Sequence, residues 1–283
     1  MRHPILLSAC LAGVVLVAGC AEQDEDAVER AFQEVNVVDE SNLNDVMLTV
    51  ADPNEAVNHF TRTANAHPER IDLQRGLAFS LVRAKRFAEA APAWEKVTKM
   101  EGASAEDSVA LADALIRTGD WAKAEATLDA LPPTHETFNR YRLEAMLADS
   151  NEEWTKSDSF YEIATGLTTR PSGVLNNWGY SKLTRGDYKE AERLFGEAIR
   201  QDPSLFTAKN NLILARGAQG DYTLPVIPMD QTERAQLLHT MALSAIKQGD
   251  VSVGKSLLRD AIETHPQHFE PAVRALDALN TKT

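Results

Sequence analysis

The residues best suited to metal binding or acid-base catalysis are seven histidines, and their spacing favours neither function. His67 and His265 each precede a proline at matching places near the ends of predicted helices, which indicates a structural role. His265 and His268 are spaced so that both could touch a metal ion, but we expect no neighbouring acid or cysteine to complete a site. The sequence shows neither a nucleophile-elbow serine nor a glycine-rich phosphate loop. We therefore predict a non-enzyme with no catalytic residue, metal ligand or cofactor. The other histidines are His3, His59, His135 and His239.

Cys20 carries the clearest chemistry in the sequence, because it stands where an apolar segment ends. Residues 4–17 are almost wholly apolar and follow a basic start, but they are too short to span a bilayer. That length and those flanks are typical of a secretory signal peptide. The segment closes with small residues and a cysteine, Val17-Ala18-Gly19-Cys20, which resembles a bacterial lipobox. The resemblance implies that residues 1–19 are removed, together with Cys10, and that Cys20 carries the lipid anchor.

The residues after Cys20 suggest where the anchored protein resides. Ala21, rather than an aspartate, follows the cysteine, which by resemblance to Gram-negative lipoproteins implies the periplasmic face of the outer membrane. Residues 20–36 are rich in acids and are predicted to form a tether. The whole chain carries 42 Asp and Glu against 29 Lys and Arg, a net charge of −13. This acidic balance argues against a nucleic-acid partner, which would need basic side chains to neutralise phosphates.

A repeat with a period of about 34 residues runs through the rest of the chain. Gly-Asp pairs at 186–187 and 220–221 are one such period apart, and the pair at 119–120 lies close to two periods before the first of these. The clearest unit, residues 172–205, places small and large residues at fixed positions on two predicted helices. This pattern is similar to the tetratricopeptide repeat (TPR), whose units are pairs of antiparallel helices. The positions that carry the resemblance are Trp178, Gly179, Gly186, Asp187, Tyr188, Ala191, Phe195, Ala198 and Pro203.

The same frame predicts the organisation of the whole chain. It fits six units, at residues 37–70, 71–104, 105–137, 138–171, 172–205 and 235–268. The resemblance therefore implies an all-α TPR solenoid of about six helical hairpins, with one broken unit and a C-terminal capping helix. The predicted boundaries are a TPR array over 37–221, an extended loop over 222–230, and a final unit with its capping helix over 231–283.

The break falls at residues 222–230, where the second helix of a unit is missing. Pro225 and Pro228 forbid a helix there and favour an extended path. A capping box at Asp230 and Glu233 predicts the start of the next helix. Two interpretations remain open: the segment is a loop that crosses a gap in the solenoid, or it is an apolar strip that docks a partner.

The first helices of TPR hairpins line a concave surface that receives a partner segment, so the resemblance implies a binding groove. Paired asparagines in that groove could hydrogen-bond a peptide backbone, and arginines could bind carboxylates. The predicted groove residues are Arg75, Phe79, Arg83, Asp113, Arg117, Arg142, Met146, Asn176, Asn177, Tyr180, Asn210, Asn211, Leu214 and His239.

Two stretches outside the generic repeat are similar to the TadD family of TPR lipoproteins, which assist assembly of tight-adherence (Flp) pili. They are ESNLNDVMLTVADPNEAV at 41–58 and YTLPVIPMDQTERAQLLHTMALSAIKQGDV at 222–251. The resemblance implies an assembly scaffold, with a pilotin-like role toward the secretin as one form of that function, and secretin or other pilus components as partners. The alternatives are an adaptor for peptidoglycan or outer-membrane assembly enzymes, and an enzyme or solute-binding protein.

Overall fold

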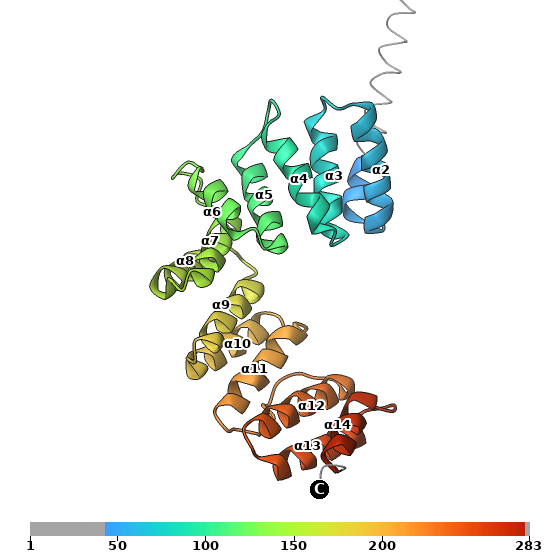
Figure 1. Cartoon of the computed structure of the whole chain (residues 1–283), viewed down its shortest axis with the longest axis vertical. Coiled ribbons are helices and arrows are strands. Elements are labelled where there is room, and N and C mark those ends of the chain that lie inside the picture. Colours follow the sequence, from blue (N-terminus) through green and yellow to red (C-terminus); the bar gives the residue numbers. More distant parts are fainter. Residues whose placement is uncertain (1–42, 281–283) are drawn as a thin grey trace, which may run out of the picture. The chain divides into compact units, whose positions relative to one another are not determined.

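The computed structural model describes residues 43–280, and these form two compact units, 43–100 and 101–280. The predicted signal peptide, Cys20, the tether and the first residues of the predicted array lie outside the described residues. Every regular element within residues 43–280 is a helix (Figure 1). None of these helices combines the length and the apolar character needed to cross a bilayer.

The N-terminal unit contains a helical segment over 43–49 and the helices α2 (Pro53–Ala66), α3 (Ile71–Arg83) and α4 (Phe87–Thr98). Asp52 begins α2 by accepting hydrogen bonds from the backbone amides of Asn54 and Glu55. The ring of Phe60 on α2 fills the core against α3, because Gly76 leaves room for it. A Cβ atom at Gly76 would lie 2.4 Å from that ring, so only glycine permits this approach.

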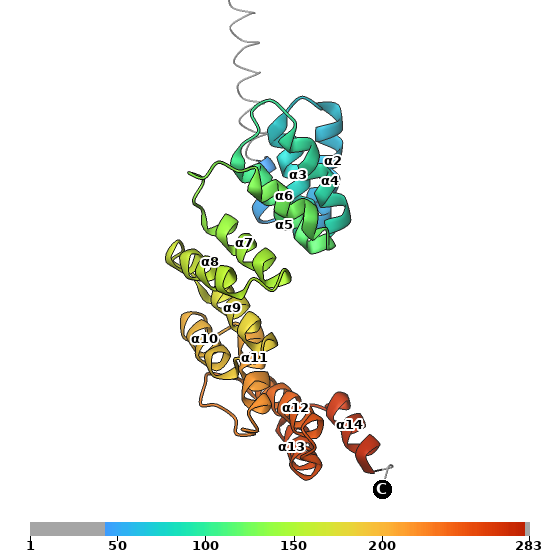
Figure 2. The ribbon, with the colours of Figure 1, turned by 60° about the vertical axis from the view of Figure 1, so that its left-hand side comes forward.

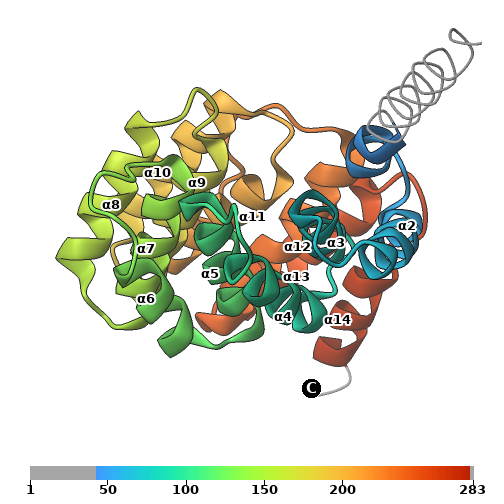
Figure 3. The same ribbon diagram turned by 90° about the horizontal axis from the view of Figure 1, so that it is seen from above.

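The C-terminal unit is a series of helical hairpins. Apart from α11, each first helix is followed along the chain by the second helix on which it packs. The hairpins are α5 (Ala105–Thr118) with α6 (Trp121–Asp129), α7 (Phe138–Ser150) with α8 (Trp154–Gly166), α9 (Ser172–Thr184) with α10 (Tyr188–Gln201), and α12 (Gln231–Lys247) with α13 (Val251–Thr264). Viewed from above, α7, α8, α9 and α10 lie together (Figure 3). α11 (Phe206–Ala218) has no second helix, and α14 (Glu270–Asn280) packs on α13 at the end of the unit.

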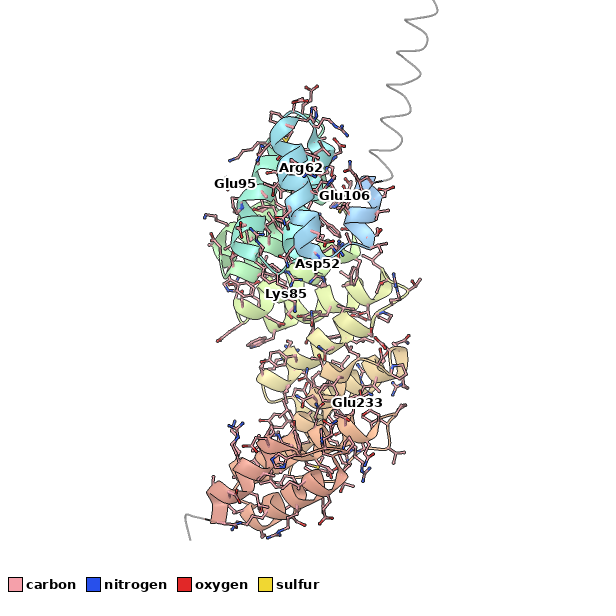
Figure 4. All side chains as sticks on the ribbon, turned by 90° about the vertical axis from the view of Figure 1, so that its right-hand side faces the viewer. Asp52, Arg62, Lys85, Glu95, Glu106 and Glu233 are labelled. Carbon is pink, nitrogen blue, oxygen red and sulfur yellow. The ribbon has the colours of Figure 1, made fainter. Side chains whose placement is uncertain are left out.

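The tight turn within each hairpin requires a left-handed backbone conformation. Glycine supplies it with φ of 82° at Gly119 and 83° at Gly186, where a side chain would be strained. Two other hairpins use a non-glycine residue at the equivalent place, Lys85 with φ of 58° and Glu152 with φ of 59°. Lys85 lies at the turn between α3 and α4 (Figure 4). These turns therefore keep the repeat geometry without the residue that adopts it most easily.

The core of the C-terminal unit follows the alternation of small and large residues that the repeat pattern predicts. Phe195 on α10 is fully buried and packs against α9 at Gly179. A Cβ atom at Gly179 would lie 2.7 Å from the Phe195 ring, so the close approach of the two helices depends on this glycine.

The segment between α11 and α12 contains no helix, and Figure 2 shows it in orange. Tyr222, Leu224 and Met229 pack against the core formed by α11 to α14, and Ile227 packs against the core of α9 to α11. Only Val226 of these apolar side chains is fully exposed. The segment thus covers apolar surface that a second helix would otherwise cover, which favours its interpretation as a loop across a gap.

A buried ion pair fixes the helices on either side of that segment. Lys209 on α11 is almost fully buried and its ammonium group lies 2.8 Å from the carboxylate of Glu233 on α12. The same carboxylate accepts a hydrogen bond from the backbone of Asp230, in the capping box that begins α12. The start of α12 is therefore tied to α11 although a whole helix is missing between them.

Candidate partner-binding face

Most of the predicted groove residues lie on the first helices of the C-terminal unit. We call the surface that α5, α7, α9, α11 and α12 contribute the first-helix face. Side-chain hydrogen bonds join each consecutive pair of these helices. From α5 to α12 these bonds join Arg142 to Asp113, Ser181 to Asp149, Asn211 to Asn176, and Thr240 to Asn210.

The predicted asparagines form a row, the amide row, that runs across three helices. Asn211 on α11 donates its amide to Oδ1 of Asn176 on α9 over 3.0 Å. Asn210 on α11 accepts at Oδ1 from the hydroxyl of Thr240 on α12 over 2.8 Å. Asn176, Asn177 and Asn210 are all partly exposed, and within the described residues nothing accepts from their amide nitrogens. The row therefore presents donors of known position to a partner.

An apolar row runs beside the amide row, with one residue on each of the same three helices. Tyr180 on α9 is 53% exposed and Leu243 on α12 is 46% exposed, with the partly buried Leu214 on α11 at the equivalent position between them in the repeat. Exposed large apolar residues that recur at one repeat position are typical of an interaction surface.

Two arginines share one carboxylate at the α5–α7 end of the face. Asp113 on α5 accepts from Nε of Arg117 over 2.6 Å and from Arg142 on α7 over 2.9 Å. Burial works to raise the pKa of Asp113, but the hydrogen bonds and charges of the two guanidinium groups outweigh it and hold the pKa below its ordinary value. Met146 lies beside Arg142 on α7, with sulfur 3.9 Å from a guanidinium nitrogen. The cluster of two arginines and one aspartate keeps a net positive charge.

His239 on α12 packs against an aromatic ring near the start of α14. Its ring meets the edge of Phe269 at 5.5 Å between centroids, and Phe269 stacks on His265 at 4.7 Å. Burial lowers the pKa of His239. The sequence analysis expected no acid beside His265 and His268, and this expectation is wrong. The carboxylate of Glu270 lies 2.8 Å from Nε2 of His268. Even so, no group of three potential metal ligands gathers anywhere in residues 43–280.

The predicted residues of the N-terminal unit, all on α3, have different surroundings. Phe79 is 45% exposed and Arg75 is partly buried. Arg83 donates to the backbone carbonyls of Met47 over 2.9 Å and of Ala51 over 3.0 Å. Its guanidinium thus holds the end of the helical segment 43–49, a role that the repeat frame alone does not indicate.

Three residues of the first-helix face were missed by the sequence reasoning. The repeat period is shorter across the break, so Thr240 and Leu243 occupy the repeat positions that Asn211 and Leu214 occupy in the preceding unit. Use of this shorter period would have identified both residues from the sequence. Asp149 was missed because it lies partly buried at the α7–α9 contact, where its carboxylate accepts from Ser157, Tyr161 and Ser181 at 2.5, 3.0 and 2.7 Å. Burial and this carboxylate raise the pKa of Tyr161 far above its ordinary value.

Comparison with known families finds the tetratricopeptide repeat twice in this chain. One family model with that description matches residues 81–148, and a second matches residues 176–224. No curated protein matches the chain.

Solved structures with a similar fold cover most of the chain at low sequence identity. The APC/C hetero-tetramer Cut9-Hcn1 is 14% identical, with a TM-score of 0.60, over 83% of this chain and 47% of that one. The human IFIT1 dimer with PPP-AAAA is 14% identical, with a TM-score of 0.55, over 81% and 59%. A tetratricopeptide repeat protein from Parabacteroides merdae is 15% identical, with a TM-score of 0.51, over 89% and 97%. The chain spans only about half of the first and three fifths of the second, and the likeness concerns the fold alone.

The repeat models, the helical hairpins and these neighbours together define the class of protein. The chain has an all-α tetratricopeptide-repeat fold, and the predicted fold class is confirmed. Proteins of this class act as scaffolds for protein–protein interactions, which agrees with a face that combines ordered polar groups and exposed apolar groups.

Proposed function

We propose that this protein is a lipid-anchored scaffold on the periplasmic face of the bacterial outer membrane, where it serves assembly of a tight-adherence (Flp) pilus. The scaffold role rests on one observation above all, the paired amide and apolar rows that cross α9, α11 and α12. The anchor rests on the lipobox-like Val17-Ala18-Gly19-Cys20, and the pilus on the resemblance of residues 41–58 and 222–251 to the TadD family.

The two rows suit an extended segment of a partner protein. Amide groups of the side chains match the donors and acceptors of a peptide backbone, so Asn176, Asn177 and Asn210 hold the main chain. The exposed faces of Tyr180 and Leu243 then bury apolar side chains of the partner. A carboxylate of the same segment is matched by the guanidinium groups of Arg117 and Arg142, which lie together at Asp113.

A lipid anchor at Cys20 gives such a scaffold its place. Each buried CH₂ group of an acyl chain contributes about 0.8 kcal/mol, so several chains on one cysteine form a durable attachment. Residues 20–36 separate this anchor from the helical units, and their acidic side chains favour a solvated tether. The binding face is then presented to partners in the periplasm.

The anchor is tested by Cys20→Ser in the full chain, followed by separation of the envelope into membrane and soluble fractions. We expect the variant to leave the outer membrane while its far-ultraviolet circular dichroism and thermal unfolding stay as in the parent. Retention of the variant in the outer membrane would contradict the proposed anchor.

The partner is tested by placing a photo-crosslinking amino acid at position 180, with a second one at the exposed position 189 of α10 as the matched control. Secretin or other pilus components captured from 180 but not from 189 support the proposal. Capture of peptidoglycan hydrolases from 180 supports the adaptor alternative instead. Equal products from both positions would remove the first-helix face as the binding surface.

A further inference from the structure

The second helix α6 is shorter than its counterparts in the other hairpins. It has 9 residues, whereas α4, α8, α10 and α13 have 12 to 14. Pro132 and Pro133 follow shortly after its end at Asp129 and prevent another turn. The next second helix, α8, has 13 residues, and Ile163 and Leu167 at its C-terminal end are exposed.

A pocket of about 180 Å³ lies beside the C-terminal half of α6, between α6, α7 and α8. Its lining has an apolar part and a charged part with charges of both signs. The apolar part consists of Leu128, Leu147, Ala148 and Phe160. The charged part, which we call the rim, consists of Glu125, Asp129, Arg140, Glu144 and Lys156.

The pocket opens onto an apolar side of α8. One face of α8 carries Lys156 and Phe160, which line the pocket. Ile163 and Leu167 continue this face at helical spacing. Ile163 is 41% exposed and Leu167 is 45% exposed. From Phe160 to Leu167 this face extends over about 10 Å, or two helical turns. We call the pocket and this face together the α6–α8 groove; it shares no residue with the first-helix face.

The charges at the rim leave an excess of negative charge. Arg140 is paired with Glu144 at 2.7 Å, and Lys156 is paired with Glu153 at 2.9 Å. Lys156 also interacts electrostatically with Glu125 and Asp129, although within the described residues no cation lies at ion-pair distance from either carboxylate. The amide of Asn151 contacts Glu125 at 3.2 Å. These two carboxylates stand one turn apart on α6 and face the same opening.

We propose that the α6–α8 groove is a second docking site, which binds a helical segment of a protein partner with apolar and basic residues on one face. The pocket volume suits one large apolar side chain and is smaller than typical small-molecule sites of about 300–1,000 Å³. When residue i of the partner helix fills the pocket, the residues at i+3 or i+4 and at i+7 of that helix lie over Ile163 and Leu167. Lysines beside them reach Glu125 and Asp129, which share the single charge of Lys156 with Glu153.

The groove is tested with two fluorescent helix-forming peptides of about 15 residues, long enough for measurable helicity. The first has leucine along one face with flanking lysines, and the second has glutamate in place of each lysine. Binding to the full chain carrying Cys20→Ser is followed by fluorescence anisotropy. We expect the lysine peptide to bind at least about tenfold more tightly than the glutamate peptide, a difference of about 1.4 kcal/mol.

Variants locate that binding. Asp129→Lys and Ile163→Ser each change an exposed residue of the groove. We expect each to lower the affinity for the lysine peptide by about tenfold. The matched control is Glu263→Lys on α13, which makes the same charge change at an exposed position outside the groove. Equal weakening by Asp129→Lys and Glu263→Lys would mean attraction to the acidic protein as a whole, and would overturn the proposal.

A second copy of the chain is the competing occupant, and sedimentation velocity identifies it. A dimer that is lost in Ile163→Ser, with no binding of the lysine peptide, would overturn the proposal in favour of self-association. Neither result depends on the outcome at Cys20 or at position 180. The tests can therefore reject this second docking site while the proposed scaffold function stands, or reject that function while the second site stands.

Discussion

Asn211 of α11 donates its side-chain amide to Oδ1 of Asn176 of α9 over 3.0 Å, and Asn211 is almost fully buried by the surrounding helices. The bond joins two consecutive first helices side chain to side chain. Because α11 has no second helix of its own, this contact helps to hold it in the register of the repeat. The adjacent Asn210 extends the same link to α12 through Thr240. One pair of neighbouring asparagines therefore ties α11 to the helix on each side of it.

Replacement of Asn176 by alanine tests the structural part of this contact. The change leaves the buried amide of Asn211 without its acceptor, and we expect the free energy of unfolding to fall by about 1–3 kcal/mol. Asn177→Ala is the matched control, because its side chain forms no hydrogen bond with the described residues and should cost less than about 0.5 kcal/mol. Urea unfolding measures both. Equal losses would contradict a structural role for the Asn176–Asn211 bond.

Replacement of Gly179 by alanine tests the close packing of α9 on α10. A new Cβ atom would lie 2.7 Å from the buried Phe195 ring, and we expect a loss of about 1–3 kcal/mol despite the better helix propensity of alanine. Gly196→Ala on α10 is the control, because its nearest contact would be an ordinary 3.7 Å to Arg200. That variant should gain about 0.5–1 kcal/mol. Thermal or urea unfolding should show opposite signs for the two substitutions.

The sequence predicted the hairpins well because their signals are local. Gly179, Phe195 and Gly186 occupy fixed repeat positions, and each has the contact or the backbone conformation that its residue type implies. The break was also visible, since Pro225 and Pro228 exclude a helix. What the sequence did not reveal depends on distant pairing. Arg83 fits the groove position of the frame, yet it is engaged by backbone carbonyls of a segment that precedes α2, far away in the chain.

The pocket beside α6 was also not predicted, although the early end of α6 is visible in the sequence. Pro132 and Pro133 indicate that a helix ends, but they do not say which side chains line the space beside it. That became evident only from the position of α8 relative to α6, which the contacts of the two helices with α7 determine. Local rules therefore give the elements, and the packing between repeats gives the sites.

Glu152 offers a prediction about the turns. It adopts a φ of 59° at the place where other hairpins have glycine, a conformation that costs a residue with a side chain about 1–2 kcal/mol. Because glycine also makes the unfolded chain more flexible, we expect Glu152→Gly to stabilise the protein by about 0.5–1 kcal/mol. Ala126→Gly, at an exposed position within α6, should instead destabilise it by about 1 kcal/mol. A loss of stability in Glu152→Gly would contradict the idea that this turn is strained.

His239 predicts a dependence of stability on pH. Burial lowers its pKa in the folded protein below the ordinary value of about 6.5, so folding favours the neutral imidazole. The contribution of His239 is complete above the unfolded pKa and is lost as the pH falls through that value toward the folded pKa. We therefore expect the stability difference between the parent and His239→Gln to shrink between about pH 7.5 and pH 5.

The comparison for His239 is His268→Gln, which removes an exposed imidazole from the same unit. Urea midpoints of the parent and both variants across that pH range make the test. If the parent and His239→Gln respond to pH in the same way, burial of His239 has no energetic effect.

Arg83 makes the last prediction, because its guanidinium joins α3 to the segment that precedes α2. With Arg83→Ala, the carbonyls of Met47 and Ala51 lose their donors, although the hydrogen bond between His59 and Asn44 at 2.8 Å still contacts the helical segment. We expect hydrogen exchange to become faster over residues 43–51 while α3 and α4 keep their protection. Arg62→Ala, at an exposed position of α2, is the control and should leave the exchange of 43–51 unchanged. Equal protection in both variants would show that Arg83 does not hold this segment, and would return it to the set of residues available to a partner.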